Sequence, residues 1–209
     1  MTWPRGTGME WNDLADLPFA DALRVHQGDL APVEAYEGAH FDGLDLAEPD
    51  AHGSRFLECA FTRVSIQGGQ LRRAQFTDVW LRDVHLISTT LAESGWVGAD
   101  VTGSVAAGVE AFAARLRRVS LRGCKLDSVN FRDAVLAEVT FDNCVLSDVD
   151  FSGATLTKTV FRHSRLTRTN FTRAVMDEVD LRGAIVTTAQ LMDLAPLLAE
   201  SMGLTVAGG

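Results

Sequence analysis

Large apolar residues recur at every fifth position along most of this chain. The series runs from residue 41 to residue 96 and, after a weaker stretch, from residue 116 to residue 181. A small residue stands two positions before each large one, and the positions between are mostly polar. A period of five matches neither the 3.6-residue period of an α-helix nor the two-residue period of a strand. It predicts a chain that turns a corner every five residues and points the small and large side chains inward.

Four such sides would close a square coil, so residues 20 positions apart should stack in neighbouring coils. Coils spaced like β-strands, about 4.8 Å apart, would bury an apolar column on each inner wall. One predicted column contains Phe41, Phe61, Leu81, Val101, Leu121, Phe141, Phe161 and Leu181. The opposite column contains Phe56, Phe76, Trp96, Leu116, Leu136, Leu156 and Met176.

This pattern resembles the pentapeptide repeat family, and the resemblance covers about residues 39–191. The resemblance implies an all-β solenoid, a right-handed quadrilateral β-helix with short C-terminal helices. The predicted organisation is an N-terminal cap segment over residues 1–38, the β-helix over 39–187 and a helical C-terminal cap over 188–209. Within the β-helix, Val101, Ala106 and Ala111 are small where large residues belong. We expect a thin coil over residues 97–115; the alternative is a projecting loop, which in this family can contact a partner.

Both ends of such a stack need covering, because open strand edges promote aggregation. The sequence from Thr187 to Gln190 predicts a helical capping box, and Pro196 is expected to begin a second helix. The apolar surplus beyond that box exceeds what one cap needs, and related proteins dimerise through this element. A homodimer is therefore expected, with capping alone as the alternative. The candidate dimer interface is Leu191, Leu194, Leu197, Leu198, Met202 and Leu204.

The N-terminal segment lies outside the five-residue series. The apolar residues of this segment are expected to cover the first coil: Trp3, Trp11, Leu14, Leu17, Phe19, Leu23 and Val25. Pro4, Pro18 and other prolines exclude a long helix there.

The charge of −9 is concentrated at one end: residues 1–60 hold 12 acidic and 3 basic residues, whereas residues 61–209 hold 16 of each. The candidate partner-binding acidic end is Asp42, Asp45, Glu48, Asp50 and Glu58. The alternative is that these carboxylates serve solubility and prevent edge-to-edge stacking. A stretch without acids supplies a candidate basic patch of Lys158, Arg162, Arg165, Arg168 and Arg173. The alternative is a solvated face paired with acids on neighbouring coils, and direct nucleic-acid binding is not expected because no aromatic residue points outward among the cations.

Composition and motifs give no sign of catalysis. The chain is 46% hydrophobic and 22% charged, as in folded proteins, with no apolar run long enough for a membrane helix and no signal peptide. Cys59, Cys124 and Cys144 occupy small inward positions, which predicts buried thiols in a reducing cytoplasm; a disulfide between the last two is the alternative. We expect neither an enzyme nor a metal site, a cofactor or a membrane partner.

The family resemblance implies a partner. Characterised relatives protect DNA gyrase from quinolones or inhibit it, and one is described as a mimic of duplex DNA. Mimicry of DNA requires rows of carboxylates along the rod. Residues 61–209 carry equal numbers of acidic and basic residues, which argues against mimicry. The sequence therefore predicts a non-catalytic protein-binding β-helix with DNA gyrase as the candidate partner. The alternative is an interaction scaffold with another partner and no topoisomerase role.

Overall fold

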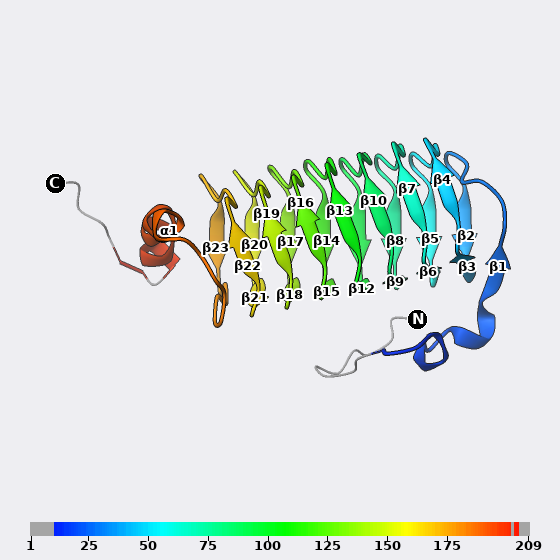
Figure 1. Ribbon diagram of the computed structural model, residues 1–209, viewed down its shortest axis with the longest axis horizontal. Helices are drawn as coiled ribbons and strands as arrows, with labels where there is room; N and C mark the ends of the chain where they lie inside the picture. The colour runs from blue at the N-terminus through cyan, green and yellow to red at the C-terminus, as the bar shows by residue number, and fades with distance from the viewer. Residues whose placement is uncertain (1–10, 202, 205–209) are drawn as a thin grey trace.

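Each five-residue unit of the chain forms one short extended side and one tight corner. The computed structural model describes residues 11–201, 203 and 204, in which these units build a parallel β-solenoid followed by one helix (Figure 1). The corner residue, two positions after each large residue, adopts a left-handed conformation, as Asp148 does with φ 53° and Arg168 with φ 52°. This left-handed residue turns the chain through each corner and brings the next apolar residue inward.

Three of the four sides are parallel sheets, named here A, B and C. Sheet A contains β1 (Arg24–His26), β3 (Ala39–Asp42), β6 (Ala60–Thr62), β9 (Trp80–Arg82), β12 (Asp100–Thr102), β15 (Ser120–Arg122), β18 (Thr140–Asp142) and β21 (Val160–Arg162). Sheet B contains β2 (Ala35–Glu37), β5 (Arg55–Leu57), β8 (Gln75–Thr77), β11 (Gly95–Val97), β14 (Arg115–Arg117), β17 (Val135–Ala137), β20 (Thr155–Thr157) and β23 (Val175–Asp177). Sheet C contains β4 (Asp45–Ala47), β7 (Ser65–Gln67), β10 (His85–Ile87), β13 (Val105–Ala107), β16 (Lys125–Asp127), β19 (Val145–Ser147) and β22 (Arg165–Thr167). The fourth side, side D, is a ladder of single bridges from Asp50↔Gln70 to Asp150↔Asn170.

The predicted inner columns are confirmed, because the strands pair with partners 20 positions away, as Phe141 does with Phe161. The rings of these two residues stack with centroids 4.9 Å apart and planes 2° apart. Phe56 and Phe76 stack in the same way on the opposite wall, 4.8 Å apart. The register begins one unit before the predicted series, since Tyr36 pairs with Phe56. Each coil thus buries its interior against its neighbours, which makes the solenoid one continuous core.

Residues 97–115 form a thin coil, as expected, and no loop projects from it. β12 and β13 keep their register with the strands on either side. The small inward residues leave an apolar cavity of about 90 Å³, lined by Trp96, Val101, Ala106, Ala111, Leu116 and neighbouring side chains. A void of this kind weakens packing in proportion to its volume.

Filling this cavity should stabilise the protein. Ala106 stacks between Leu86 and Leu126, so Ala106→Leu restores the large residue of its column. The expected gain is about 1–2 kcal/mol in the free energy of unfolding, from the roughly 24 cal/mol per Å³ that cavities cost. The matched control is Ala154→Leu at a fully buried small position, which should destabilise by about 1–3 kcal/mol through overpacking. Urea melts of the two variants and the wild type check both values; a destabilised Ala106→Leu would contradict the cavity.

The C-terminal cap is a single helix, α1 (Thr188–Ser201). The predicted capping box is present: the Thr187 amide donates to Gln190 Oε1 at 3.0 Å, and the Gln190 amide donates to Thr187 Oγ1 at 3.2 Å. The prediction of a second helix beginning at Pro196 is wrong, because Pro196 lies inside α1. The helix continues past this residue while Leu194, Leu197 and Leu198 pack against the solenoid core. Among the described residues, no helix is long and apolar enough to cross a membrane.

The N-terminal segment caps the solenoid differently from the prediction. β1 extends sheet A by pairing with β3, and His26 packs edge-on against Tyr36 at the open end. Before β1, an arm with two 3-10 helices (Leu14–Asp16 and Ala20–Ala22) runs back along the side that carries β6 and β9 (Figure 1). Trp11, Leu17 and Phe19 therefore cover the flank of sheet A and not the first coil. Trp3 lies outside the described residues.

Candidate interaction surfaces

The outward residues of the solenoid are fixed by strand geometry. In each three-residue strand the central side chain points inward and its two neighbours point outward, as the exposed–buried–exposed pattern of β14 shows. Two outward residues lie on the same side when they belong to the same strand, two positions apart, or to strands of the same sheet, which follow one another every 20 positions. This rule decides which charges meet on the surface.

The five residues of the predicted acidic end lie on different sides. Asp42 is on sheet A and Asp45 on sheet C, whereas Asp50 is on side D. Glu48 and Glu58 are corner residues with positive φ. Together they surround the first two coils as a collar, and the structure does not gather them on one surface.

Two members of the collar are held by neighbours. Asp42 accepts hydrogen bonds from Thr62 Oγ1 and from Arg63 Nη2, the latter at 2.5 Å, and the Thr62 bond holds the pKa of Asp42 below its usual range. Asp50 accepts from the His52 side chain and amide, with Nδ1 at 2.7 Å, and this lowers the pKa of Asp50. Both carboxylates therefore remain ionised at neutral pH, and each has a local structural role.

The contact between Asp42 and Thr62 continues to His40, whose Nε2 lies 2.9 Å from Thr62 Oγ1. Because the Thr62 hydroxyl donates to Asp42, it accepts from His40, and the imidazole cannot take its proton. Burial lowers the pKa of His40, so this ring is neutral near pH 7. The three side chains line a cavity of about 260 Å³ beneath the N-terminal arm, beside Trp80 and Arg82. Their hydrogen-bond directions indicate a structural network.

The five residues of the predicted basic patch are also dispersed around the rod. Arg162 is on sheet A and Arg165 on sheet C, while Lys158, Arg168 and Arg173 are corner residues. Arg168 forms a bidentate ion pair with Asp148 on the preceding coil, Nε to Oδ1 at 2.5 Å, which lowers the pKa of that carboxyl. No basic patch forms from these residues.

A denser group of cations lies on sheet B and was missed from the sequence. Arg115 and Arg117 are the two outward residues of β14, and Arg118 is the corner residue that follows them. Arg115 and Arg117 are exposed and Arg118 is half-buried. The sequence carries a signal for this group: residues 111–126 contain five cations and no acid, whereas the same number of cations in the predicted basic patch is spread over residues 151–176.

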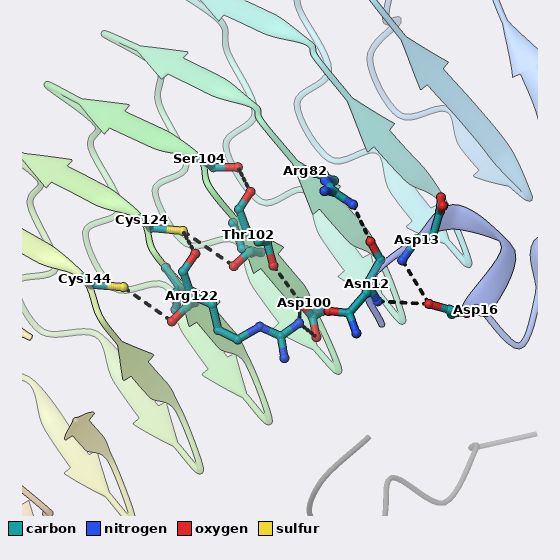
Figure 2. A network of polar contacts seen from close by, with 12 residues as sticks. Asn12, Asp13, Asp16, Arg82, Asp100, Thr102, Ser104, Arg122, Cys124 and Cys144 are labelled. Carbon is teal, nitrogen blue, oxygen red and sulfur yellow. Dashed lines mark hydrogen bonds and ion pairs between the residues drawn. The ribbon is translucent and has the colours of Figure 1, made fainter. Parts of the chain in front are cut away.

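The N-terminal arm occupies part of sheet A. Trp80, at an outward position of β9, is only 2% exposed because Trp11, Leu17 and Phe19 of the arm cover it and Ala60. Arg82 donates to the backbone oxygen of Asn12 in the arm (Figure 2). The arm thereby removes two coils of sheet A from the surface that a partner can reach.

Beyond the arm, sheet A carries a buried ion pair. Arg122 Nη2 lies 3.0 Å from Asp100 Oδ1 and 3.2 Å from Oδ2 (Figure 2). Asp100 is only 3% exposed. This pair joins two neighbouring coils of sheet A. Arg122 is therefore engaged in an ion pair within the chain, unlike the arginines of β14 among the described residues.

The comparisons with known proteins agree with this architecture. The family model for the pentapeptide repeat region matches residues 113–193, and the structure continues the same repeat through all coils from β2 to β23. The chain is a pentapeptide repeat protein. Curated proteins give no significant match to it.

Solved structures share the fold of this pentapeptide repeat protein. A trypsin-treated variant of QnrB1, described as a plasmid-mediated fluoroquinolone resistance protein, superposes with a TM-score of 0.56 at 20% identity, covering 88% of this chain and 96% of that one. A second such variant gives 0.52 at 21% identity, covering 88% and 95%. HetL, a pentapeptide repeat protein involved in heterocyst differentiation regulation from the cyanobacterium Nostoc, gives 0.35 at 16% identity over 76% and 92%. The likeness to the two QnrB1 variants supports the fold alone.

The cysteines of this pentapeptide repeat protein are free and buried. The Cys144 thiol donates hydrogen bonds to the backbone carbonyls of Leu121 and Asp142. The Cys124 thiol donates in the same way to the carbonyls of Val101 and Arg122 (Figure 2). Burial raises the pKa of the Cys59 thiol to about 11. In the described part of the chain, no group of three or more His, Cys, Asp or Glu side chains is placed to hold a metal ion.

The candidate dimer residues separate into two sets. Leu194 is 3% exposed and packs on the last coil, and Leu197 and Leu198 are partly buried against the same core. Leu191 and Leu204 are 51% and 60% exposed, and Met192 beside them is 71% exposed. Met202 lies outside the described residues. Among the described members of the six predicted residues, Leu191 and Leu204 are the exposed ones.

Proposed function

We propose that this pentapeptide repeat protein is a non-catalytic interaction protein in the cytoplasm that binds a protein partner through an outer face of the solenoid. The observation that carries the proposal is the outer surface of sheet B. Its eight strands are in register and no loop interrupts them. Exposed Leu57, Val135 and Val175 lie on it beside arginines that form no ion pair with any residue the structure describes. Flat surfaces that combine apolar and arginine side chains are typical of protein interfaces.

The proposed partner is DNA gyrase or another type II topoisomerase, with protection from quinolones as the outcome. The support is the fold shared with QnrB1, which is a fluoroquinolone resistance protein. Mimicry of duplex DNA is not part of this proposal. Among the described residues, no outward position carries an acidic side chain on three successive coils, whereas the backbone of DNA presents a charge at every step. Binding would depend on shape and on local charge pairs.

A supercoiling assay tests this partner. Purified gyrase is titrated with the protein, with and without a fluoroquinolone, at two salt concentrations. The expected result is inhibition of supercoiling or relief of drug inhibition at low micromolar protein, weakening as salt rises because the contributing charges are exposed. No effect from a protein shown by circular dichroism to be folded would contradict the topoisomerase role.

The patchwork of charge favours a second candidate function, an interaction scaffold with a different partner. Acids and bases alternate around the coils and often pair between them, as Arg72 and Arg73 do with Glu93. A surface of this kind has no large area of one sign of charge, so long-range electrostatic attraction does not select one partner. Failure of the supercoiling assay would therefore shift the proposal to this scaffold role.

We also propose that the protein is a homodimer joined through α1. Exposed Leu191 and Met192 follow the capping box and are not needed to cover the last coil. A two-fold contact between two copies of this surface is a common way to bury such residues.

A further inference from the structure

We infer that the arginines of β14 form a docking site for an acidic segment of a protein partner, centred on sheet B. This inference deepens the proposed function and rests on its claim that sheet B binds a protein. The site consists of Arg115, Arg117 and Arg118, together with the uncharged strands on either side. We call it the β14 arginine site.

The composition of sheet B sets it apart from the other two sheets. Its two carboxylates are at its ends, Glu37 on β2 and Asp177 on β23. Every charged residue on the six strands between them is an arginine, namely Arg55, Arg115 and Arg117. Sheets A and C instead carry acids on inner strands, for example Asp142 on β18 and Asp127 on β16. A carboxylate brought to the middle of sheet B thus meets cations and no acid on that sheet.

The guanidinium groups of the site are not used by the residues that the structure describes. Elsewhere, Arg168 is paired with Asp148 and Arg122 with Asp100. In the part of the chain that the structure describes, the guanidinium groups of Arg115, Arg117 and Arg118 make no ion pair and no hydrogen bond. The next coil offers Asp133 and Glu138 at its corners, and neither pairs with them. Their donors are available to a partner.

The surroundings of the site favour a protein over a nucleic acid. Arg115 stacks between Gly95 and Val135, and Arg117 between Val97 and Ala137, so the cations do not continue along the rod. A nucleic acid presents phosphates in succession and would need further cations along its path. A protein segment needs only two or three carboxylates beside apolar side chains, and Val97, Val135 and Ala137 supply the apolar floor.

The spacing indicates what the segment looks like. Arg115 and Arg117 are two positions apart on one extended strand, which places their Cα atoms roughly 6.6 Å apart on one face. Carboxylates two positions apart on an extended partner segment have the same separation. Each arginine can then engage one carboxylate of this segment through parallel hydrogen bonds.

An alternating Glu-Val peptide is the probe, titrated into isotopically labelled protein and followed by NMR. We expect saturable shifts of the Arg115 and Arg117 Nε–H signals and of the β11, β14 and β17 amides. The Arg115→Gln/Arg117→Gln double variant should bind at least about tenfold more weakly. The matched control is Arg162→Gln/Arg165→Gln, which removes the same charge from sheets A and C and should bind as the wild type does.

Three results would overturn the inference: no saturable binding, equal weakening in both double variants, or stronger binding of a DNA duplex that depends on Arg115 and Arg117. A Lys-Val peptide should not bind. Unchanged thermal melts confirm that the variants, all at exposed positions, remain folded. The peptide titration requires no topoisomerase. The gyrase assay can therefore fail while the peptide still binds, and the two claims are tested separately.

Discussion

Phe151→Asp is expected to unfold the solenoid. Phe151 is fully buried and stacks between Phe131 and Phe171, with centroids 5.2 Å and 5.3 Å away. The substitution removes both stacks and leaves an ionised carboxylate in an interior without a partner for it. Losing a buried phenylalanine costs about 3–5 kcal/mol, and an unpaired buried charge adds to this. The sum approaches the whole stability of a typical domain, about 5–15 kcal/mol.

Circular dichroism and a urea melt measure this effect. The matched control is Phe112→Asp, because Phe112 is 41% exposed on side D and the same change of side chain should alter the stability by less than about 1 kcal/mol. A cooperative melt of Phe151→Asp at the wild-type midpoint would show that this side chain does not face the core.

Leu194→Asp and Leu191→Asp should have opposite consequences although they lie one turn apart on α1. Leu194 is 3% exposed and covers the last coil, so its replacement should destabilise the protein by about 3 kcal/mol. It also uncovers the edge of β23, the strand that α1 contacts, and we expect concentration-dependent aggregation. Leu191 is 51% exposed, so Leu191→Asp should leave the stability within about 0.5 kcal/mol of the wild type.

Melts and light scattering after size exclusion separate the two roles. The wild type should elute with the mass of two chains and Leu191→Asp with the mass of one. A monomeric wild type would exclude the proposed dimer, and a stable, unaggregated Leu194→Asp would exclude the capping role of that residue.

The core of this protein could be predicted from its sequence because the solenoid has one register. Once the five-residue period was seen, the inward position of Phe141, Phe161 and their column followed from counting. The thin coil followed in the same way, since Trp96 and Leu116 are one full coil apart and pair in the structure.

The surface could not be predicted from charge density along the chain. Successive outward residues turn onto different sides, so Arg162, Arg165 and Arg168 are close in sequence but lie on two different sheets and a corner. Arg115 and Arg117 meet because they belong to one strand. Applying the strand rule to the sequence would have found the β14 arginine site.

The position of the N-terminal arm was also hidden, although one residue signalled it. Outward positions are mostly polar, and Trp80 departs from that rule in the middle of a regular coil. An outward tryptophan requires a cover, and the arm provides it with Trp11 and Phe19. At the C-terminal end, the preference of proline for the first position of a helix predicted a boundary at Pro196. Packing of α1 on the last coil instead keeps one helix continuous past Pro196.

Direct binding to purified gyrase, measured by interferometry, tests the central claim that this solenoid acts by engaging a protein through sheet B. The account predicts saturable binding of the wild type in the micromolar range or tighter. It also predicts at least about tenfold weaker binding of Arg115→Gln/Arg117→Gln and unchanged binding of Arg162→Gln/Arg165→Gln. Absence of binding by folded wild-type protein, or equal binding by all three proteins, would contradict it.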